Sequence, residues 1–285
     1  MNRRGFALVA AVWLLTALSV TVAGVMELAR QGRRAALNRI SLARGHWSGE
    51  ACEAILRARF AAKPLTRSTD TVDLGRGAWC IATLQDPQAL LNLNTADATT
   101  LRAVLGSDSM VAAILDWRDA DSLPRTFGAE RAWYRQQRRA LPRDSAFTSV
   151  RELRLVRGLE HVQEDQLDRV FTVAGSGQVN LNVAPIVVLA ALPALDAELV
   201  AFIERRRASG QRLQSSDEFL TALDPASRTR LAMRGGLSPS AVTFESNRLL
   251  LTVRGGVSGS PAVFRTTIEV VPSAGRLAVI SRGLE

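Results

Sequence analysis

Residues 1–26, MNRRGFALVAAVWLLTALSVTVAGVM, decide the fold of this chain, because they join a short basic segment to a long uncharged one. The uncharged run extends from Phe6 to Met26. As an α-helix it spans roughly 31 Å, which matches the hydrocarbon core of a bilayer. Arg3 and Arg4 precede the run, so the N-terminus is expected in the cytoplasm. The sequence therefore predicts a single membrane-spanning helix followed by an exported body.

Three interpretations of this segment remain open at the level of sequence. It is a secretory signal cut after Ala23, an uncleaved anchor, or a prepilin signal cut after Gly5. The third interpretation is favoured, because a glycine stands at the junction between the basic residues and the apolar run. Cleavage there removes the leader, residues 1–5, and leaves Phe6 as the first residue of a helix that is kept.

The chain downstream of the apolar run continues with a helical pattern. Apolar residues recur at three- and four-residue steps and predict a buried stripe. The stripe consists of Leu37, Ile40, Ala43, Trp47, Ala51, Ala54, Ile55 and Ala58. Pro64 marks the end of the pattern. One helix over residues 6–62, about 85 Å long, is therefore expected.

The rest of the chain predicts an α+β protein in which a helical block interrupts a small sheet. Residues 63–89 contain a polar loop over 63–77 and then a strand, AWCIATL. Residues 90–236 are rich in helical patterns. Residues 237–285 contain AVTFES, RLLLTVRG, AVFRTTIEVV and RLAVISRG, four β-branched runs that predict an antiparallel meander.

The helical block contains an internal repeat over residues 90–160 and 178–223. The segment NLNTA at Asn92 aligns with NLNVA at Asn180, an offset of 180 − 92 = 88. FTSVREL at Phe147 aligns with LQSSDEF at Leu213, an offset of 213 − 147 = 66. The first copy therefore carries an insert of 88 − 66 = 22 residues. This alignment pairs Arg118 with Arg206, and the asparagines are expected to cap helices.

The repeat units resemble helix-hairpin-helix and sterile-alpha-motif-like folds, some of which bind DNA. DNA-binding hairpins use a Gly-x-Gly turn, so that backbone amides reach a phosphate. The turns at residues 104–108 and 192–196 lack paired glycines. Asp108 and Asp196 would also repel phosphate. No nucleic-acid partner is therefore expected, and an exported DNA receptor is kept as the alternative function.

The composition excludes several classes of chemistry. The chain has 285 residues, 47% of them hydrophobic, and a net charge of +9, which fits a folded protein. Two histidines and two cysteines are too few for a multi-histidine metal site, a zinc finger or a cysteine-ligated iron–sulfur cluster. Neither a hydrolase motif nor a phosphate-binding glycine loop is present. The sequence therefore predicts a structural subunit and not an enzyme.

One stretch resembles a known family. ILDWRDADSLPRTFGAERAWY over residues 114–134, followed by FTSVRELRLVRGL and then VNLNVAP, is similar to the type II secretion system protein K family. These are minor pseudopilins with a type IV pilin-like fold. The resemblance extends to Ala10, which stands where most pilins carry a glutamate.

The resemblance implies a fold, a location and partners. The fold is a long pilin helix with a small antiparallel sheet and a large inserted helical domain. The protein is expected in the inner membrane, with its C-terminal domain in the periplasm. It would form the tip of the pseudopilus with I- and J-type minor pseudopilins and other pseudopilins. There it would prime pseudopilus assembly, support the export of folded proteins across the outer membrane, and meet secreted cargo or the secretin. Prepilin peptidase would cut between Gly5 and Phe6 and methylate Phe6.

An acidic cluster in the insert is a candidate calcium site, because close carboxylates can bind a hard cation through oxygen. Its members are Asp116, Asp119, Asp121 and Glu130. Relatives that bind calcium in the helical domain support this interpretation. The alternative is a solvated acidic turn paired with nearby arginines, and the spacing is not that of an EF-hand.

Cys52 and Cys80 are a candidate disulfide. The first lies on the long helix and the second on the first predicted strand, so they can approach if the helix packs on the sheet. An exported chain permits such a bond. Two separate buried thiols are the alternative, and the sequence does not decide between them.

Overall fold

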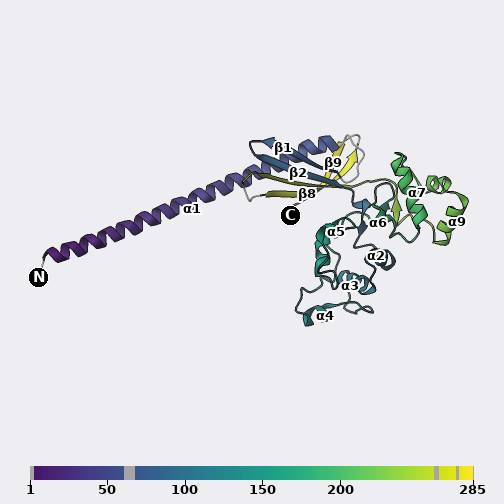
Figure 1. Cartoon of the computed structure of the whole chain (residues 1–285), viewed down its shortest axis with the longest axis horizontal. Helices are drawn as coiled ribbons and strands as arrows, with labels where there is room; N and C mark the ends of the chain where they lie inside the picture. Colours follow the sequence, from purple (N-terminus) through teal and green to yellow (C-terminus); the bar gives the residue numbers. More distant parts are fainter. Residues whose placement is uncertain (1–2, 61–67, 260–262, 274–275, 285) are drawn as a thin grey trace.

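The computed structural model describes residues 3–60, 68–259, 263–273 and 276–284. It consists of a long helix, a five-stranded sheet packed on part of that helix, and a helical domain beyond the sheet (Figure 1). The α+β class predicted from the sequence is confirmed.

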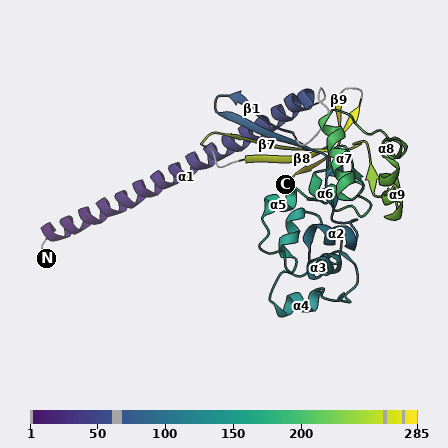
Figure 2. The same cartoon turned by 45° about the vertical axis from the view of Figure 1, so that its right-hand side comes forward.

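Helix α1 runs over Arg3–Phe60 without a break, and Gly5 and Phe6 lie within it. Its N-terminal half extends away from the rest of the molecule (Figures 1 and 2). Among the described residues, α1 alone is long and apolar enough to cross a membrane. Its most apolar window has a mean hydropathy of 1.8, and no residue of that window is buried. This helix fits a single-pass membrane anchor.

The sheet has the strand order β1-β2-β7-β8-β9, and every neighbouring pair is antiparallel. The strands are β1 Ser68–Gly75, β2 Ala78–Gln85, β7 Leu249–Val257, β8 Val263–Ser273 and β9 Arg276–Leu284. Strand β1 corrects the expectation of a loop over residues 63–77, of which 63–67 lie outside the described residues. The polar sequence STDTVDLG hides this edge strand, because among residues 69–75 only Val72 is buried in the core.

The helical domain is inserted between two hydrogen-bonded strands. Strand β2 pairs directly with β7, and Gln85 at the end of β2 lies opposite Leu250. The predicted boundary at residue 236 is wrong, because Val242 and Phe244 belong to the core of the helical domain. AVTFES is therefore not part of the meander. Its strand β6, Val242–Thr243, pairs in parallel with β5, Val179–Asn180, inside the helical domain.

The face of α1 that packs on the sheet is not the predicted stripe. Leu37, Ile40 and Trp47 are 52%, 50% and 70% exposed, and of the predicted stripe only Ile55 packs against the core. The buried face carries mainly small residues instead: Gly45, Ser48, Gly49, Cys52, Glu53 and Leu56. Small side chains let the helix axis come close to the sheet, whereas a hydrophobic period does not count glycine, serine or glutamate. The periodicity thus predicted the helix correctly, but the face that it predicted to be buried is the face exposed to solvent.

Helix α1 approaches the sheet closely at two glycines. A Cβ atom on Gly255 of β7 would lie 2.9 Å from the backbone nitrogen of Gly49 and 3.2 Å from its Cα atom. A Cβ atom on Gly49 would overlap the ring of Phe264. Neither position has room for a side chain, so this contact fixes the distance between helix and sheet.

A disulfide and an ion pair hold α1 to two different strands of the sheet, β2 and β9. Cys52 and Cys80 form a disulfide with a Cα–Cα distance of 5.9 Å, and both are fully buried. The structure thus joins α1 to β2. On the other side, Arg282 of β9 lies 3.0 Å from the buried carboxylate of Glu53. The bridge and the ion pair together pin the last third of α1 across the strands.

The helical domain consists of two copies of one unit that share a single core. The first copy contains β3 Leu91–Asn92, α2 Ala98–Leu105, α3 Asp108–Arg118, α4 Arg131–Gln136, η2 Val150–Leu155, α5 Glu164–Asp168 and β4 Phe171–Thr172. The second contains β5, α6 Ile186–Leu189, α7 Ala197–Ala208, α8 Ser216–Ala222, α9 Pro225–Met233 and β6. A short helix η1, Pro87–Ala89, connects β2 to the first copy. Each copy is closed by a two-residue parallel pair, β3 with β4 and β5 with β6.

Equivalent hydrogen bonds establish the alignment of the copies. The amide of Asn94 donates to the Phe147 carbonyl (3.0 Å) and accepts from the Phe147 N–H (2.8 Å). Asn182 makes the same pair of bonds with Leu213, at 2.7 and 2.9 Å. These asparagines therefore tie loops together, which corrects their expected role as helix caps. Helix α2 is capped by Asp97, whose carboxylate accepts from the Thr100 N–H at 2.7 Å.

The same comparison corrects the pairing of the arginines. Arg118 donates to the carbonyls of Leu93 and Ala96. In the second copy the matching carbonyls belong to Leu181 and Ala184, and Arg207 donates to them. Arg118 therefore corresponds to Arg207 and not to Arg206. The offset between copies changes from 88 to 207 − 118 = 89 within the hairpin, because the second turn is one residue longer.

Candidate functional site

Three carboxylates meet where the insert of the first copy folds back on α3. Asp116 lies in the last turn of α3, Asp119 follows that helix, and Glu130 directly precedes α4. Each offers one oxygen, and these three oxygens lie within 4.8 Å of one another. Gly128 makes this return possible, because a Cβ atom there would overlap the Asp116 carboxylate. The part played by Gly128 could not be predicted from the sequence, where its only signal is a glycine within the insert.

Arg125 neutralises two of these carboxylates. Its guanidinium donates to Asp116 Oδ1 at 2.7 Å and also to Asp119, while its backbone N–H lies 3.2 Å from Asp116 Oδ2. The hydrogen bonds that Arg125 donates to Asp119 and Asp116 raise the pKa of its guanidinium. Asp116 is completely buried, so this pairing offsets the cost of removing its charge from water.

Glu130 is the member of the cluster in which both carboxylate oxygens lack a partner within the described part of the chain, whereas Asp119 has one such oxygen. The residue is 3% exposed, and neither carboxylate oxygen has a hydrogen-bond partner among the described residues. Burial raises the pKa of Glu130 to about 7, and repulsion from Asp116 and Asp119 adds to this shift. A buried carboxylate without a partner is costly in its charged form. Of the three carboxylates, Glu130 is therefore the one whose charged form a bound cation would stabilise most.

Asp121 is not part of this cluster. It is exposed, and its carboxylate accepts a hydrogen bond from the Leu123 N–H at 2.8 Å. Of the four predicted ligands, the structure brings together Asp116, Asp119 and Glu130. Sequence spacing could not separate Asp121 from them, because the separation depends on where the chain turns after α3.

The residues of the cluster fit a hard divalent cation. The donors are carboxylate oxygens only, which calcium and magnesium prefer. The two buried oxygens of Glu130 without partners are the observation that favours a cation over a simple acidic turn. The second copy serves as an internal control. At an offset of 89, Arg205 occupies the position of Asp116, and the insert that carries Glu130 is missing.

The two hairpin turns retain acidic side chains. Asp108 pairs with Arg102 across the first hairpin. Asp196 caps α7 by accepting from the Leu199 N–H at 2.9 Å and lies 3.0 Å from Arg230. The hydrogen bond from Leu199 lowers the pKa of Asp196, so the residue stays charged. The first turn contains one glycine, Gly106, and the second contains none. Neither turn has the paired glycines of a phosphate-binding hairpin.

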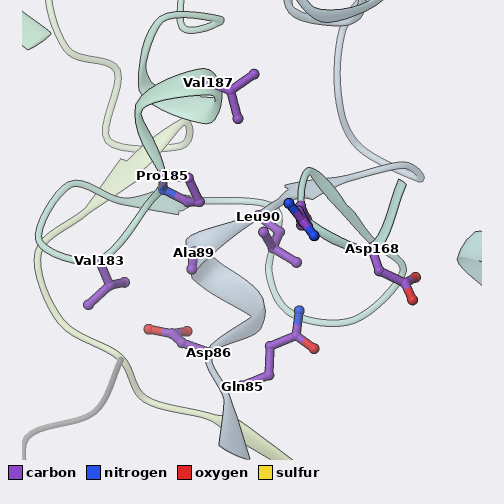
Figure 3. A pocket seen from close by; sticks show the side chains of 9 residues that line it. Gln85, Asp86, Ala89, Leu90, Asp168, Val183, Pro185 and Val187 are labelled. Atoms are coloured by element: carbon purple, nitrogen blue, oxygen red, sulfur yellow. The ribbon is translucent and has the colours of Figure 1, made fainter. Parts of the chain in front are cut away.

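A cavity lies where the helical domain joins the sheet (Figure 3). This cavity of about 270 Å³ is lined by Gln85, Asp86, Ala89, Leu90, Asp168, Arg169, Val183, Pro185 and Val187. Asp86 accepts hydrogen bonds from Ser246 and from the Gln88 N–H. Burial raises its pKa. Ser246 also accepts from Asn180 at 2.8 Å, so this network links β2 to the second copy.

Comparison with known proteins identifies the first copy. Residues 84–176 match the model of the first domain of type II secretion system protein K. The resemblance found in the sequence is thereby confirmed. The fold is similar to that of a chain in the crystal structure of the GspK-GspI-GspJ complex from the enterotoxigenic Escherichia coli type 2 secretion system, with a TM-score of 0.59 and 17% identity. The match covers 90% of this chain and 98% of that one. No curated protein gives a significant match.

Proposed function

We propose, from the match of residues 84–176 to type II secretion system protein K, that the chain acts as a minor pseudopilin. The observation that carries this proposal is the combination of that domain with a pilin-like body. A single apolar helix, α1, packs by its C-terminal part on an antiparallel sheet, and the matched domain is inserted between two strands of that sheet. The chain would be held in the inner membrane with this body in the periplasm.

The solvent face of α1 supports a role in a helical assembly. Leu37, Ile40 and Trp47 form an apolar surface that the protein's own sheet leaves uncovered. Apolar residues at helical spacing on a free face fit the side of another helix. In this proposal neighbouring pseudopilins cover the surface once α1 leaves the membrane. Ala10 adds no charge to the apolar run, which suits a subunit without a neighbour ahead of it.

The helical domain favours the end of the filament. It lies beyond the sheet, at the opposite end of the molecule from the N-terminus (Figures 1 and 2). A domain of this bulk would obstruct a further subunit stacked above it. We therefore place the protein at the tip with I- and J-type minor pseudopilins, by analogy with the GspK-GspI-GspJ complex. From there it would prime assembly, support export, and meet cargo or the secretin.

The N-terminus of the mature protein tests this function. In cells with prepilin peptidase, mass spectrometry is expected to find a chain that starts at a methylated Phe6. In cells without the peptidase, Gly5 and the residues before it should remain. The reason is that cleavage on the cytoplasmic side keeps the apolar helix on which the assembly depends. A mature chain that starts at Gly24 would contradict the proposal and favour the exported DNA receptor.

We also propose that Asp116, Asp119 and Glu130 bind calcium in the periplasm. Calcium would supply positive charge to the uncompensated Glu130 and so hold the insert against α3. The remaining ligands would be water or backbone oxygens, because calcium takes six to eight.

Melting curves of the wild type and of Glu130→Gln test this site. Without metal, the wild type is expected to lose stability as the pH rises from about 4.5 to above 7. Its folded state holds a proton that the unfolded state releases at a lower pH, since the pKa of Glu130 is raised from 4.5 to about 7. The loss is on the order of 3 kcal/mol. Glu130→Gln should remove this loss, because the amide does not titrate.

Calcium should stabilise the wild type and have little effect on Glu130→Gln. Asp121→Ala is the matched control, because Asp121 lies outside the cluster and should leave the calcium response unchanged. An equal calcium response in the wild type and in Glu130→Gln would contradict the site.

A further inference from the structure

The second copy carries an apolar groove. The groove lies between α6 and α7 and has a volume of about 430 Å³. It is lined by Ile186, Ala190, Ala197, Val200, Ala201, Glu204 and Arg205. Ile186 is exposed, as are Ala190, Ala197 and Ala201. Apolar surface is thus open to solvent along one side of this hairpin.

The alignment of the copies explains why the groove is open. In the first copy, Arg102 of α2 pairs with Asp108 of α3 and spans the space between the helices. At offsets of 88 and 89, Ala190 and Ala197 occupy the positions of these two residues. The second hairpin has therefore replaced both members of an ion pair by alanine. The groove between the helices is therefore lined at these two positions by alanine methyl groups.

In the first copy, the C-terminal part of this face, on α3, is covered by the chain's own insert. Asp116 is completely buried beneath Arg125 and Gly128 of the insert, and Ala112, one turn earlier, is 7% exposed. Their counterparts in the second copy, Arg205 and Ala201, are both exposed. The protein's own residues thus cover Asp116 and Ala112 in the first hairpin, whereas the equivalent residues of the second hairpin are open to solvent.

We infer that a neighbouring pilin-like subunit covers this groove with a short segment that carries apolar side chains and a carboxylate. The charges set the chemistry of the segment. In the first copy the helix supplies a carboxylate, Asp116, and the insert supplies an arginine, Arg125. In the second copy the helix supplies Arg205, which has no ion-pair partner among the described residues. The complementary segment must therefore supply the acid.

Continuity of the surface indicates a neighbouring pilin-like subunit as the partner. From Ile186 the apolar surface continues to Val187 and Pro185, which line the cavity beside the end of β2 (Figure 3). The groove is thus joined to the end of β2, where the pilin-like body meets the helical domain, and a subunit packed alongside that body would reach it. This inference rests on the proposed function, because it requires pilin-like neighbours.

Site-specific photocrosslinking in the full-length chain tests this inference. A photoreactive amino acid at Ala201 is used in cells that also produce the I- and J-type minor pseudopilins of the same secretion system. We expect a crosslink to one of these two proteins. The control position is Ala103, which is exposed on α2 of the first copy and should give none.

The double substitution Ala190→Arg, Ala197→Asp copies the ion pair of the first hairpin into the groove. It should preserve the melting temperature, because both positions are exposed, and reduce the crosslink by about tenfold, equivalent to roughly 1.4 kcal/mol of binding. Arg205→Glu should also weaken the crosslink, since it opposes an acidic partner.

The outcomes separate the two proposals. Copurification of the three proteins without a crosslink from position 201 would overturn the groove while leaving the minor pseudopilin function intact. The same conclusion would follow from a crosslink that persists in the double variant, or from one to a secreted protein only. Failure of the three proteins to copurify would instead overturn the proposed function, and the groove inference with it.

Discussion

Reduction of the disulfide between Cys52 and Cys80 is expected to destabilise the pilin-like part of the protein by about 3–4 kcal/mol. The bond closes a loop with a sequence separation of 28 between α1 and β2. Opening a loop of this length restores conformational entropy to the unfolded chain and shifts the balance by about 3.6 kcal/mol. Both cysteines are buried, and the helix face around them offers few large apolar side chains in compensation.

The measurement is chemical unfolding of the detergent-solubilised chain with and without reductant. The helical domain is the internal control, because it contains no cysteine and has its own core. Its transition should stay in place while that of the sheet and α1 moves to lower denaturant. Cys52→Ala with Cys80→Ala should reproduce the reduced state in the absence of reductant. Identical unfolding of the oxidised and reduced chains would show that the bridge has no stabilising role.

Gly255→Ala is expected to destabilise the contact between α1 and the sheet by about 1–3 kcal/mol, the usual range for overpacking. The added Cβ atom would lie 2.9 Å from the Gly49 backbone nitrogen. Backbone cannot rotate aside as a side chain can, so α1 must move away from β7. Alanine normally stabilises a strand relative to glycine, which makes a loss at this position informative.

Gly32→Ala is the matched control for this substitution. Gly32 lies on α1, and a Cβ atom there would meet nothing within 4 Å. Alanine should therefore stabilise the helix by about 1 kcal/mol. Equilibrium unfolding of both variants gives the comparison. If Gly255→Ala were as stable as the wild type, the close approach of helix and sheet would not exist in solution.

The large divisions of the molecule follow from strong local patterns. A long uncharged run beside Arg3 and Arg4 allows few structures other than a membrane helix. The repeated NLNxA segments identify a duplicated unit without any structure. The order of elements then places the helical block between strands, as the pairing of β2 with β7 shows.

Details that depend on small residues or on turns could not be predicted. The packing face of α1 was assigned wrongly, because glycine, serine and glutamate do not register in a hydrophobic period. Because the two hairpins differ in length by one residue, the residue of the second copy that is equivalent to Arg118 is Arg207 and not Arg206. Asp121 stays outside the carboxylate cluster, and its carboxylate accepts a hydrogen bond from the Leu123 N–H instead. In each case, geometry beyond the reach of local spacing decides the result.

The direct pairing of β2 with β7 has a consequence for how this molecule can be altered. The entering and leaving chain ends of the helical domain emerge from adjacent hydrogen-bonded strands. In the topology of the sheet, the whole domain therefore takes the place of the loop that connects the two strands of a β-hairpin. Its removal in favour of a tight turn, or its exchange for a different domain, would leave the strand order untouched. The long helix and the sheet thus form a scaffold that does not depend on the inserted domain. The domain inserted between β2 and β7 determines which surface this scaffold presents.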